Sequence, residues 1–430
     1  MYEIDRKLIE REEKGDPILV SLIGTGQMGS EIIIQTGMMK GMIVAAAVDL
    51  TFDRVVSAYR QAGYEGKIVE TNDLEEAAKA IKAGARVATT DYHVAVKLPM
   101  VHAVIDATGL PQMGAEVSLL SFENKKHVVM MNVECDVTIG PILRKKAQEH
   151  GVVYSLAAGD EPGAIIELYR FAHALGYKIV AAGKGKNNPL NIYATPGDEE
   201  WANKAAARNM SARMLIEFVD GSKTMVEMAA VSNATGLVPD VRGMHGPKAN
   251  IKELTKVFSL KEQGGILNQE GVVDYGIGDI NPGVFVIIQT YNERMREGLV
   301  QRDMGDGPNY LLLRPYHLCS IEVPLTVAQE VLYGESTGYP GKKLTSECIT
   351  VAKRDLKAGQ VLDRIGEFCY RASIDRYEVA KEGNMLPVGL AYGAKLKCDV
   401  AKDEIITYDM VELDENSTFV KLRRMQNEMM

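Results

Sequence analysis

One stretch of this chain, residues 18–29, limits the possible folds more than any other. It reads Ile-Leu-Val-Ser-Leu-Ile-Gly-Thr-Gly-Gln-Met-Gly, an apolar run typical of a buried strand followed by glycines at GxGxxG spacing. In that pattern Gly24 permits a tight turn, Gly26 lets a pyrophosphate approach the backbone, and Gly29 lets the next helix pack against its strand. The N-terminus of that helix would carry the phosphate charge.

The residues after this turn complete a βαβ unit of about thirty residues. An apolar helical pattern covers Ser30–Met39, and a second apolar run, Met42–Val48, ends at Asp49. An acidic residue at this place suits a ribose 2′-hydroxyl and favours NAD, whereas Arg54 could accommodate the 2′-phosphate of NADP. The sequence therefore predicts a dinucleotide site and leaves NAD and NADP open. A glycine turn of purely structural importance is the alternative.

Strand-like and helix-like patterns alternate from about Leu19 to Ser155. This alternation predicts an α/β fold, in which residues 1–155 form an NAD(P)-binding Rossmann domain with a doubly wound parallel sheet. Within it, Val87–Met100 is expected to be an insertion with a short helix. Ligands of such sheets bind outside the carboxyl ends of the strands. The predicted cofactor-binding residues there are Gly24, Thr25, Gly26, Gln27, Met28, Gly29, Asp49, Arg54, Ala107, Thr108, Gly109 and Asn132.

Length and charge limit the classes of protein and partner. At 430 residues the chain exceeds what one hydrophobic core usually serves, so we expect two or three domains. A formal charge of −9 gives no basic field for nucleic acid or for an anionic membrane surface. The N-terminus lacks an apolar signal core, no stretch reaches the roughly 18 apolar residues of a membrane span, and the five cysteines form no CxxC pair. These features predict a cytoplasmic protein with reduced thiols.

Residues 156–345 are expected to form an α+β catalytic and dimerisation domain with three polar segments. In the first, Asp160 and Glu161 precede a helical pattern, where they could cap the helix or face substrate hydroxyls or a cation. The second, Ala182–Pro189, reads Ala-Gly-Lys-Gly-Lys-Asn-Asn-Pro after an apolar strand. Its glycines, lysines and amides predict an anion cradle, with a solvated basic loop as the alternative. The predicted substrate ligands in this segment are Lys184, Asn187 and Asn188.

The third segment, Phe218–Met228, contains Lys223 and Glu227, which share one face if the segment is helical. Its Met, Ala and Val residues predict a buried helix. A buried Lys–Glu pair could place an ammonium beside a carbonyl oxygen and a carboxylate beside the hydroxyl proton, as carbonyl reduction requires. An exposed pair would be only a weak ion pair. The candidate catalytic residues are Lys186, Lys223, Glu227 and Asp220.

Two further residues of the middle part, Arg242 and His245, lie in a loop rich in glycine and proline. We expect them to bind a substrate phosphate, although a loop histidine can also be structural. The chain has no HExxH-like metal spacing. A divalent cation, if the reaction uses one, would be held by dispersed carboxylates such as Asp160, Glu161 and Asp220.

The last part of the chain, residues 346–430, reads as short strands with frequent turn signals and predicts a small β-rich domain. The stretches Ala352–Gly359 and Val400–Glu404 each precede an apolar run and resemble the SAF domain. In the N-terminal part, Val104–Gly109 and Val128–Asn132 look like the nucleotide-binding domain of homoserine dehydrogenases. Where those enzymes carry Ala-Asn-Lys, this chain has Met131-Asn132-Val133 and then Glu134, which argues against homoserine as substrate.

Over nearly its whole length the chain is similar to the DXR-like (DRL) oxidoreductases. This resemblance implies a homodimeric, NADPH-dependent reductase or reductoisomerase acting on a small, phosphorylated keto sugar or polyol. The best-known member converts 1-deoxy-D-xylulose 5-phosphate to 2-C-methyl-D-erythritol 4-phosphate, a step of isoprenoid biosynthesis. Two alternatives stay open: a homoserine dehydrogenase-type hydroxy- or amino-acid dehydrogenase, and a non-enzymatic NAD(P)-binding sensor that engages a partner through the SAF-like tail.

Overall fold

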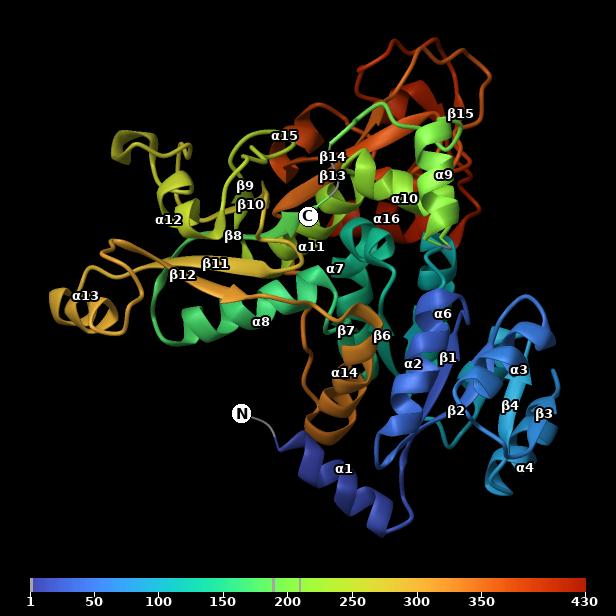
Figure 1. Cartoon of the computed structure of the whole chain (residues 1–430). Coiled ribbons are helices and arrows are strands. Elements are labelled where there is room, and N and C mark those ends of the chain that lie inside the picture. Colours follow the sequence, from blue (N-terminus) through green and yellow to red (C-terminus); the bar gives the residue numbers. More distant parts are fainter. Residues whose placement is uncertain (1–2, 188–189, 209) are drawn as a thin grey trace. The chain divides into compact units, whose positions relative to one another are not determined.

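The computed structural model describes residues 3–187, 190–208 and 210–430, which form two compact units (Figure 1). Unit 1 comprises Met1–Gly163, Leu318–Tyr339 and Lys421–Met429, and unit 2 comprises Ala164–His317, Pro340–Val420 and Met430. Each unit thus combines segments that lie far apart in the sequence. The domain boundaries at 155 and 345 stay a prediction.

Unit 1 is built on a parallel sheet of seven strands in the order β3-β4-β2-β1-β5-β6-β7. The predicted α/β class with a doubly wound parallel sheet is confirmed. The strands are β1 (Ile18–Ile23), β2 (Met42–Val48), β3 (Ile68–Glu70), β4 (Arg86–Thr89), β5 (Ala103–Asp106), β6 (His127–Met130) and β7 (Tyr154–Leu156). The helices are α1 (Ile4–Glu13), α2 (Gln27–Met38), α3 (Phe52–Gln61), α4 (Leu74–Lys82), α5 (Tyr92–Lys97), α6 (Pro111–Glu123), α7 (Val133–His150) and α14 (Cys319–Tyr333); α16 (Thr418–Met429) ends this unit.

Helices cover both faces of this sheet, which explains why its strands read as continuous apolar runs. On one face, Ile32 of α2, Tyr59 of α3 and Val327 of α14 belong to one core cluster. On the other, Ala77 of α4 and Val117 of α6 belong to a second. The expected insertion at Val87–Met100 divides into β4 and the short helix α5, because Asp91 accepts a hydrogen bond from the His93 N–H and caps the helix.

Unit 2 contains a mixed sheet of five strands in the order β12-β11-β8-β10-β9. Its strands are β8 (Lys178–Lys186), β9 (Val238–Pro239), β10 (Val272–Ile277), β11 (Val284–Gln289) and β12 (Asn309–Arg314). Helix α8 (Glu161–Ala174) leads into this unit, which also holds α9 (Glu199–Ala207), α10 (Ala212–Val219), α11 (Ser222–Thr235), α12 (Leu254–Val257) and α13 (Glu293–Val300). The C-terminal part adds the antiparallel pairs β13 (Ser346–Ala352) with β14 (Tyr370–Arg376) and β15 (Lys395–Leu396) with β16 (Val411–Glu412), and the helix α15 (Tyr377–Glu382).

Helix α11 is the buried centre of unit 2. It contacts β10 of the five-stranded sheet and also β13 and β14 of the C-terminal part. Three polar residues of this helix, Ser222, Glu227 and Asn233, are at most 2% exposed. The predicted buried helix is therefore confirmed. Among the described residues, no helix combines the length and the apolar character needed to cross a bilayer.

Candidate functional site

The glycine turn of unit 1 has the geometry that its spacing predicts. Gly24 has a φ of +96°, and a Cβ there would lie 2.9 Å from the carbonyl oxygen of Ala107. At Gly29 a Cβ would lie only 2.0 Å from the oxygen of Gly24, so this glycine lets α2 pack against the turn. At Gly26 a Cβ would meet no atom within 4 Å. Its backbone is thus open to an approaching group, as pyrophosphate binding requires.

Asp49, at the end of β2, is held by the glycine turn. One carboxylate oxygen accepts hydrogen bonds from the N–H and the hydroxyl of Thr25, each 2.9 Å long. The other accepts from the Leu50 N–H and from Arg54 Nη1. Burial raises the pKa of Asp49, but these hydrogen bonds outweigh it and leave the pKa below its usual range. Because a carboxylate offers about four lone-pair sites, this one is already saturated.

The neighbouring strand end is organised by Asp106, a fully buried residue of β5. One of its oxygens accepts from the N–H and the hydroxyl of Thr108, at 3.0 and 2.6 Å, which shapes the predicted turn Ala107–Gly109. Burial raises the pKa of Asp106 to about 6, although the Thr108 hydrogen bonds oppose this. The amide of Asn132, which caps α7, lies 3.5 Å from the second oxygen of Asp106.

The predicted cofactor residues of unit 1 therefore gather at one edge of the sheet. They follow β1, β2, β5 and β6, which are adjacent in the order β2-β1-β5-β6. Gln27 and Met28 lie in the first turn of α2, Gln27 exposed and Met28 half-buried. The contact between Gly24 and Ala107 lies where the strand order passes from β1 to β5. In open α/β sheets, ligands bind at such a switch point.

In unit 2, Lys184 and Lys186 lie within strand β8. The prediction of a glycine-rich loop at these residues was wrong. The glycines serve close packing: a Cβ at Gly183 would lie 2.0 Å from the Asp274 oxygen, and one at Gly185 would lie 2.3 Å from the Asn281 nitrogen. Because side chains alternate along a strand, both lysines leave the sheet on the same face.

These two lysines meet the helix that the sequence singled out. Lys184 forms an ion pair with Glu227 of α11, and both side chains are buried. Lys223, one turn earlier on α11, lies 3.8 Å from the other oxygen of Glu227. Lys186 donates a hydrogen bond to the carbonyl of Phe218. Burial and the charge of Lys184 lower the pKa of Lys186 to about 8, although Asp220 and Glu227 oppose this.

Asp220 is fully buried beside this group. Its carboxylate lies 2.6 Å from the ammonium of Lys353, which follows β13, and it accepts a hydrogen bond of 2.8 Å from the Ser222 N–H. Burial raises the pKa of Asp220 in spite of these partners. Lys353 carries no signal in the local sequence that could have assigned it to this group.

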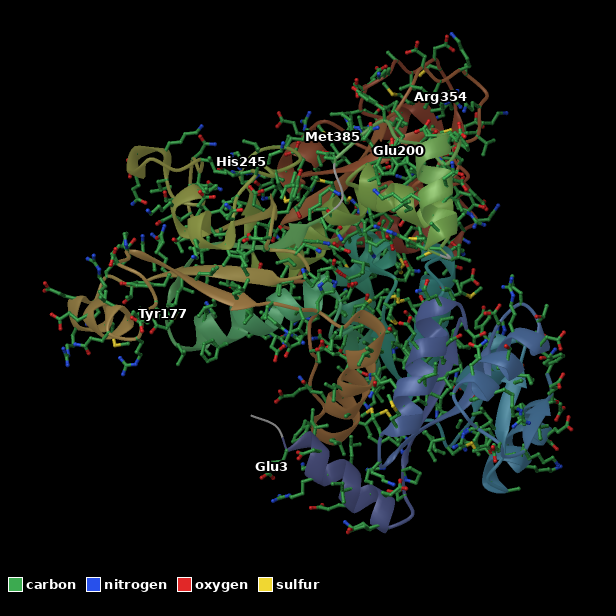
Figure 2. All side chains as sticks on the ribbon, in the orientation of Figure 1. Glu3, Tyr177, Glu200, His245, Arg354 and Met385 are labelled. Atoms are coloured by element: carbon green, nitrogen blue, oxygen red, sulfur yellow. The ribbon has the colours of Figure 1, made fainter. Side chains whose placement is uncertain are left out.

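The loop with Arg242 and His245 is separated from the lysines. His245, labelled in Figure 2, lies 2.8 Å from Asp274 through Nδ1 and 3.4 Å from Asp240 through Nε2. The hydrogen bond to Asp274 raises the pKa of His245, although burial opposes it. Asp274 pairs with Gly183 in the sheet and so leaves it on the face opposite to the lysines. Arg242 is paired with Asp375 at 2.5 Å. A substrate phosphate at this loop would have to compete with the carboxylates of Asp274, Asp240 and Asp375 for His245 and Arg242.

The remaining predicted residues belong to the first two polar segments. Asp160 and Glu161 are buried at the end of the first segment of unit 1, where α8 begins. Asp160 accepts a hydrogen bond of 3.4 Å from the thiol of Cys319, which belongs to the same unit. Asn187 is exposed just after β8. Asn188 lies outside the described residues.

Comparison with solved structures finds partial similarity to several oxidoreductases. A probable dehydrogenase from Thermotoga maritima is 13% identical over 74% of this chain and 90% of its own, with a TM-score of 0.39. DOX-P reductoisomerase in complex with magnesium is 14% identical over 74% of this chain and 70% of its own, also at 0.39. Scyllo-inositol dehydrogenase from Lactobacillus casei, solved with bound NAD(H) and scyllo-inositol, is 11% identical over 75% and 92%, again at 0.39.

The whole sequence matches no curated protein. The SAF-like tail and the relation to homoserine dehydrogenase stay predictions. Residues 159–323 match the family model described as "Oxidoreductase DRL, catalytic domain". This segment includes Lys184, Lys186 and the whole of α11. Over these residues the chain is thus similar to the catalytic domain of the DRL oxidoreductases.

Proposed function

We propose that this protein is an NAD(P)H-dependent oxidoreductase that reduces the carbonyl group of a small, phosphorylated keto sugar or polyol. 1-Deoxy-D-xylulose 5-phosphate is one such compound, and rearrangement of its carbon skeleton would make the reaction a reductive isomerisation. The observation that carries this proposal is the lysine group on β8 and α11, which consists of the buried Lys184, Lys186 and Glu227 and the half-buried Lys223. It lies inside the segment that is similar to an oxidoreductase catalytic domain.

The composition of this group suits an anionic substrate. Lys184 and Lys223 both pair with the Glu227 carboxylate, and the charges of Lys184 and Glu227 also act on the ammonium group of Lys186. In a buried setting, charge-assisted hydrogen bonds to phosphate or enolate oxygens are stronger than in water. The chain as a whole carries a charge of −9 and repels anions, so an anionic substrate needs a local group of positive charges such as this one.

Lys186 is the proposed proton donor. Carbonyl reduction adds a hydride to carbon and a proton to oxygen, and the reduced nicotinamide would supply the hydride. With a pKa of about 8, Lys186 is largely protonated at neutral pH and yet releases its proton more readily than an ordinary lysine. Lys184 and Lys223 would stabilise the developing alkoxide. Glu227 would orient both ammonium groups. In the reverse direction the neutral amine of Lys186 would accept the hydroxyl proton.

The cofactor would bind at the carboxyl-end edge of the unit 1 sheet. A reduced dinucleotide fits there, since Gly26 leaves its backbone open and α2 begins beside it. NAD and NADP remain alternatives: Asp49 is already saturated with hydrogen bonds, and the exposed Arg54 could turn from Asp49 to a 2′-phosphate. Asp160 and Glu161 stay candidates for a divalent cation. A homodimer and a cytoplasmic location belong to this proposal on the sequence resemblance alone.

A turnover assay tests the proposal. NADH and NADPH oxidation would be followed at 340 nm with a panel of keto sugar phosphates, with and without Mg²⁺, and with aspartate semialdehyde as a separate arm. We expect oxidation with a sugar phosphate and loss of about 10²–10⁴-fold in kcat for Lys186→Met. Lys357→Met, an exposed lysine of the same unit, is the matched control. Reduction of aspartate semialdehyde alone would favour the homoserine dehydrogenase type, and cofactor binding without any turnover would favour a sensor.

A further inference from the structure

Lys353 makes an unusual set of contacts for a lysine from a C-terminal β-rich region. Its ammonium lies 2.6 Å from the Asp220 carboxylate and donates to the carbonyls of Ala194 and Glu367, at 2.9 and 3.0 Å. An ammonium has three N–H donors; the two carbonyls take two of them, and the Asp220 carboxylate pairs with the charge. The side chain is 1% exposed. One buried charge thus joins the C-terminal part to two places in the middle of the chain, Ala194 and Asp220.

The contact with Asp220 lies at the beginning of α11. Asp220 precedes that helix, and its other carboxylate oxygen accepts the Ser222 N–H. Orphan N–H groups of a first helical turn need such acceptors. The Lys353–Asp220 pair therefore lies directly at the position where the helix starts. Lys223 and Glu227 follow within the next two turns.

The C-terminal part holds α11 at further points. The Ala372 N–H of β14 donates to the Ser222 hydroxyl at 2.9 Å. At the other end of the helix, the side-chain oxygen of Asn233 accepts from the N–H groups of Thr345 and Ser346, at 2.8 and 3.0 Å. Both ends of α11 are therefore hydrogen-bonded to the chain after residue 344. Figure 2 labels Arg354, the residue after Lys353, on this C-terminal part.

We propose that Lys353 is a positioning residue, which through Asp220 sets the start of α11 and so holds Lys223 and Glu227 beside Lys184. The β-rich C-terminal region then has a defined structural role, because it fixes the geometry of the lysine group from outside the five-stranded sheet. The catalytic consequence of this inference rests on the proposed function, whereas the positioning itself does not.

The pKa of Lys186 is a second quantity that depends on the Lys353–Asp220 pair. The negative charge of Asp220 supports the charged form of Lys186 and opposes the burial that lowers its pKa. Replacing the Lys353–Asp220 pair by a neutral pair removes that support together with the charge of Lys353, which is not among the charges that shift the pKa of Lys186. The pKa of Lys186 should then fall below its value of about 8.

The experiment compares two double variants. Lys353→Met with Asp220→Asn removes the buried pair but keeps an oxygen for the Ser222 N–H, which avoids the unpaired buried charge that Lys353→Met alone would create. Lys357→Met with Asp399→Asn removes an exposed ion pair of the same region and is the control. Far-UV circular dichroism and thermal unfolding check that each variant folds.

Two readouts need no turnover. Hydrogen exchange of peptides covering residues 222–235 should be about tenfold faster in the buried-pair variant than in wild type and unchanged in the control. Reaction of Lys186 with an acylating reagent, followed by mass spectrometry against pH, should have its midpoint shifted to lower pH. Unchanged exchange of residues 222–235, or faster exchange spread equally over all peptides of unit 2, would overturn the inference.

The positioning role and the proposed reaction can fail independently, and the measurements separate the two cases. If wild type oxidises no NAD(P)H but the exchange and labelling changes occur, the positioning role stands and the proposed reaction falls. If wild type is active, the buried-pair variant should lose at least about tenfold in kcat with little change in the KM of the cofactor. Unchanged kcat together with unchanged exchange would reject the positioning role while leaving the oxidoreductase intact.

Discussion

Asp136 of α7 permits a quantitative test of the unit 1 core. The side chain is completely buried, and one carboxyl oxygen accepts a hydrogen bond of 2.8 Å from the Tyr154 hydroxyl. Burial raises the pKa of Asp136 to about 7, although the Tyr154 hydrogen bond opposes this. Because the folded-state pKa lies above the unfolded value of about 3.9, folding retains a proton on this group. Its contribution to stability is fully present below about pH 3.9 and is lost as the pH rises toward 7.

The size of the effect follows from this difference of about three pKa units. At about 1.4 kcal/mol per unit, ionisation of Asp136 costs the folded state about 4 kcal/mol above pH 8 and about 1.5 kcal/mol at pH 5. Asn has nearly the same shape, can still accept from the Tyr154 hydroxyl and does not ionise. Relative to wild type, Asp136→Asn should therefore gain about 3 kcal/mol in unfolding free energy between about pH 5 and pH 8.5.

The assay is urea unfolding of both proteins at several pH values, with hydrogen exchange of peptides covering residues 133–150 to read α7 itself. Comparing the change with pH removes any constant effect of the substitution. Glu123→Gln, an exposed carboxyl on α6, is the control and should show no such change. Parallel stability curves for wild type and Asp136→Asn would refute the reasoning, because they would mean that Asp136 ionises in the folded state at no cost.

Three further predictions concern the two sites. If Lys186 donates the proton, wild-type kcat should fall as the pH rises through about 8, and a pH–rate profile without that limb would contradict the assignment. Gly29→Ala should abolish dinucleotide binding in calorimetry, since its Cβ would lie 2.0 Å from Gly24, whereas Gly37→Ala in the same helix meets only the Ala62 oxygen at 3.9 Å and should bind normally. Arg54→Ala should weaken NADPH about tenfold and NADH little, and equal losses would exclude a 2′-phosphate contact.

The fold of unit 1 could be predicted from the sequence because its strands and turns are each encoded by residues that are close together in the chain. A strand buried on both faces is a run of apolar residues, and the turn after β1 needs glycines at fixed positions. The same locality made α11 predictable, because its Met, Ala and Val residues marked it as buried and its Lys223–Glu227 spacing is that of one helical turn. Each of these features depends on residues a few positions apart.

The sequence was misleading where the cause lies far along the chain. Gly183 and Gly185 resembled a ligand loop because glycine and lysine are uncommon inside strands. They are needed because the backbones of Asp274 and Asn281 approach them closely, about ninety residues later. Lys353 could not be found for the same reason, since its partner Asp220 precedes it by more than a hundred residues. Periodicity carries no information about such contacts.

The burial of α11 has a consequence for how the protein is made. During synthesis this helix leaves the ribosome about a hundred residues before β13 and β14, the strands that it contacts. Until then Ser222 and Asn233 lack the backbone groups that they bind in the finished protein. The helix that carries Lys223 and Glu227 therefore makes these hydrogen bonds only after residues 345–372 have been synthesised. A chain that stops before residue 345 would carry Lys223 and Glu227 on a helix that lacks these partners, so the order of α11 depends on residues made long after it.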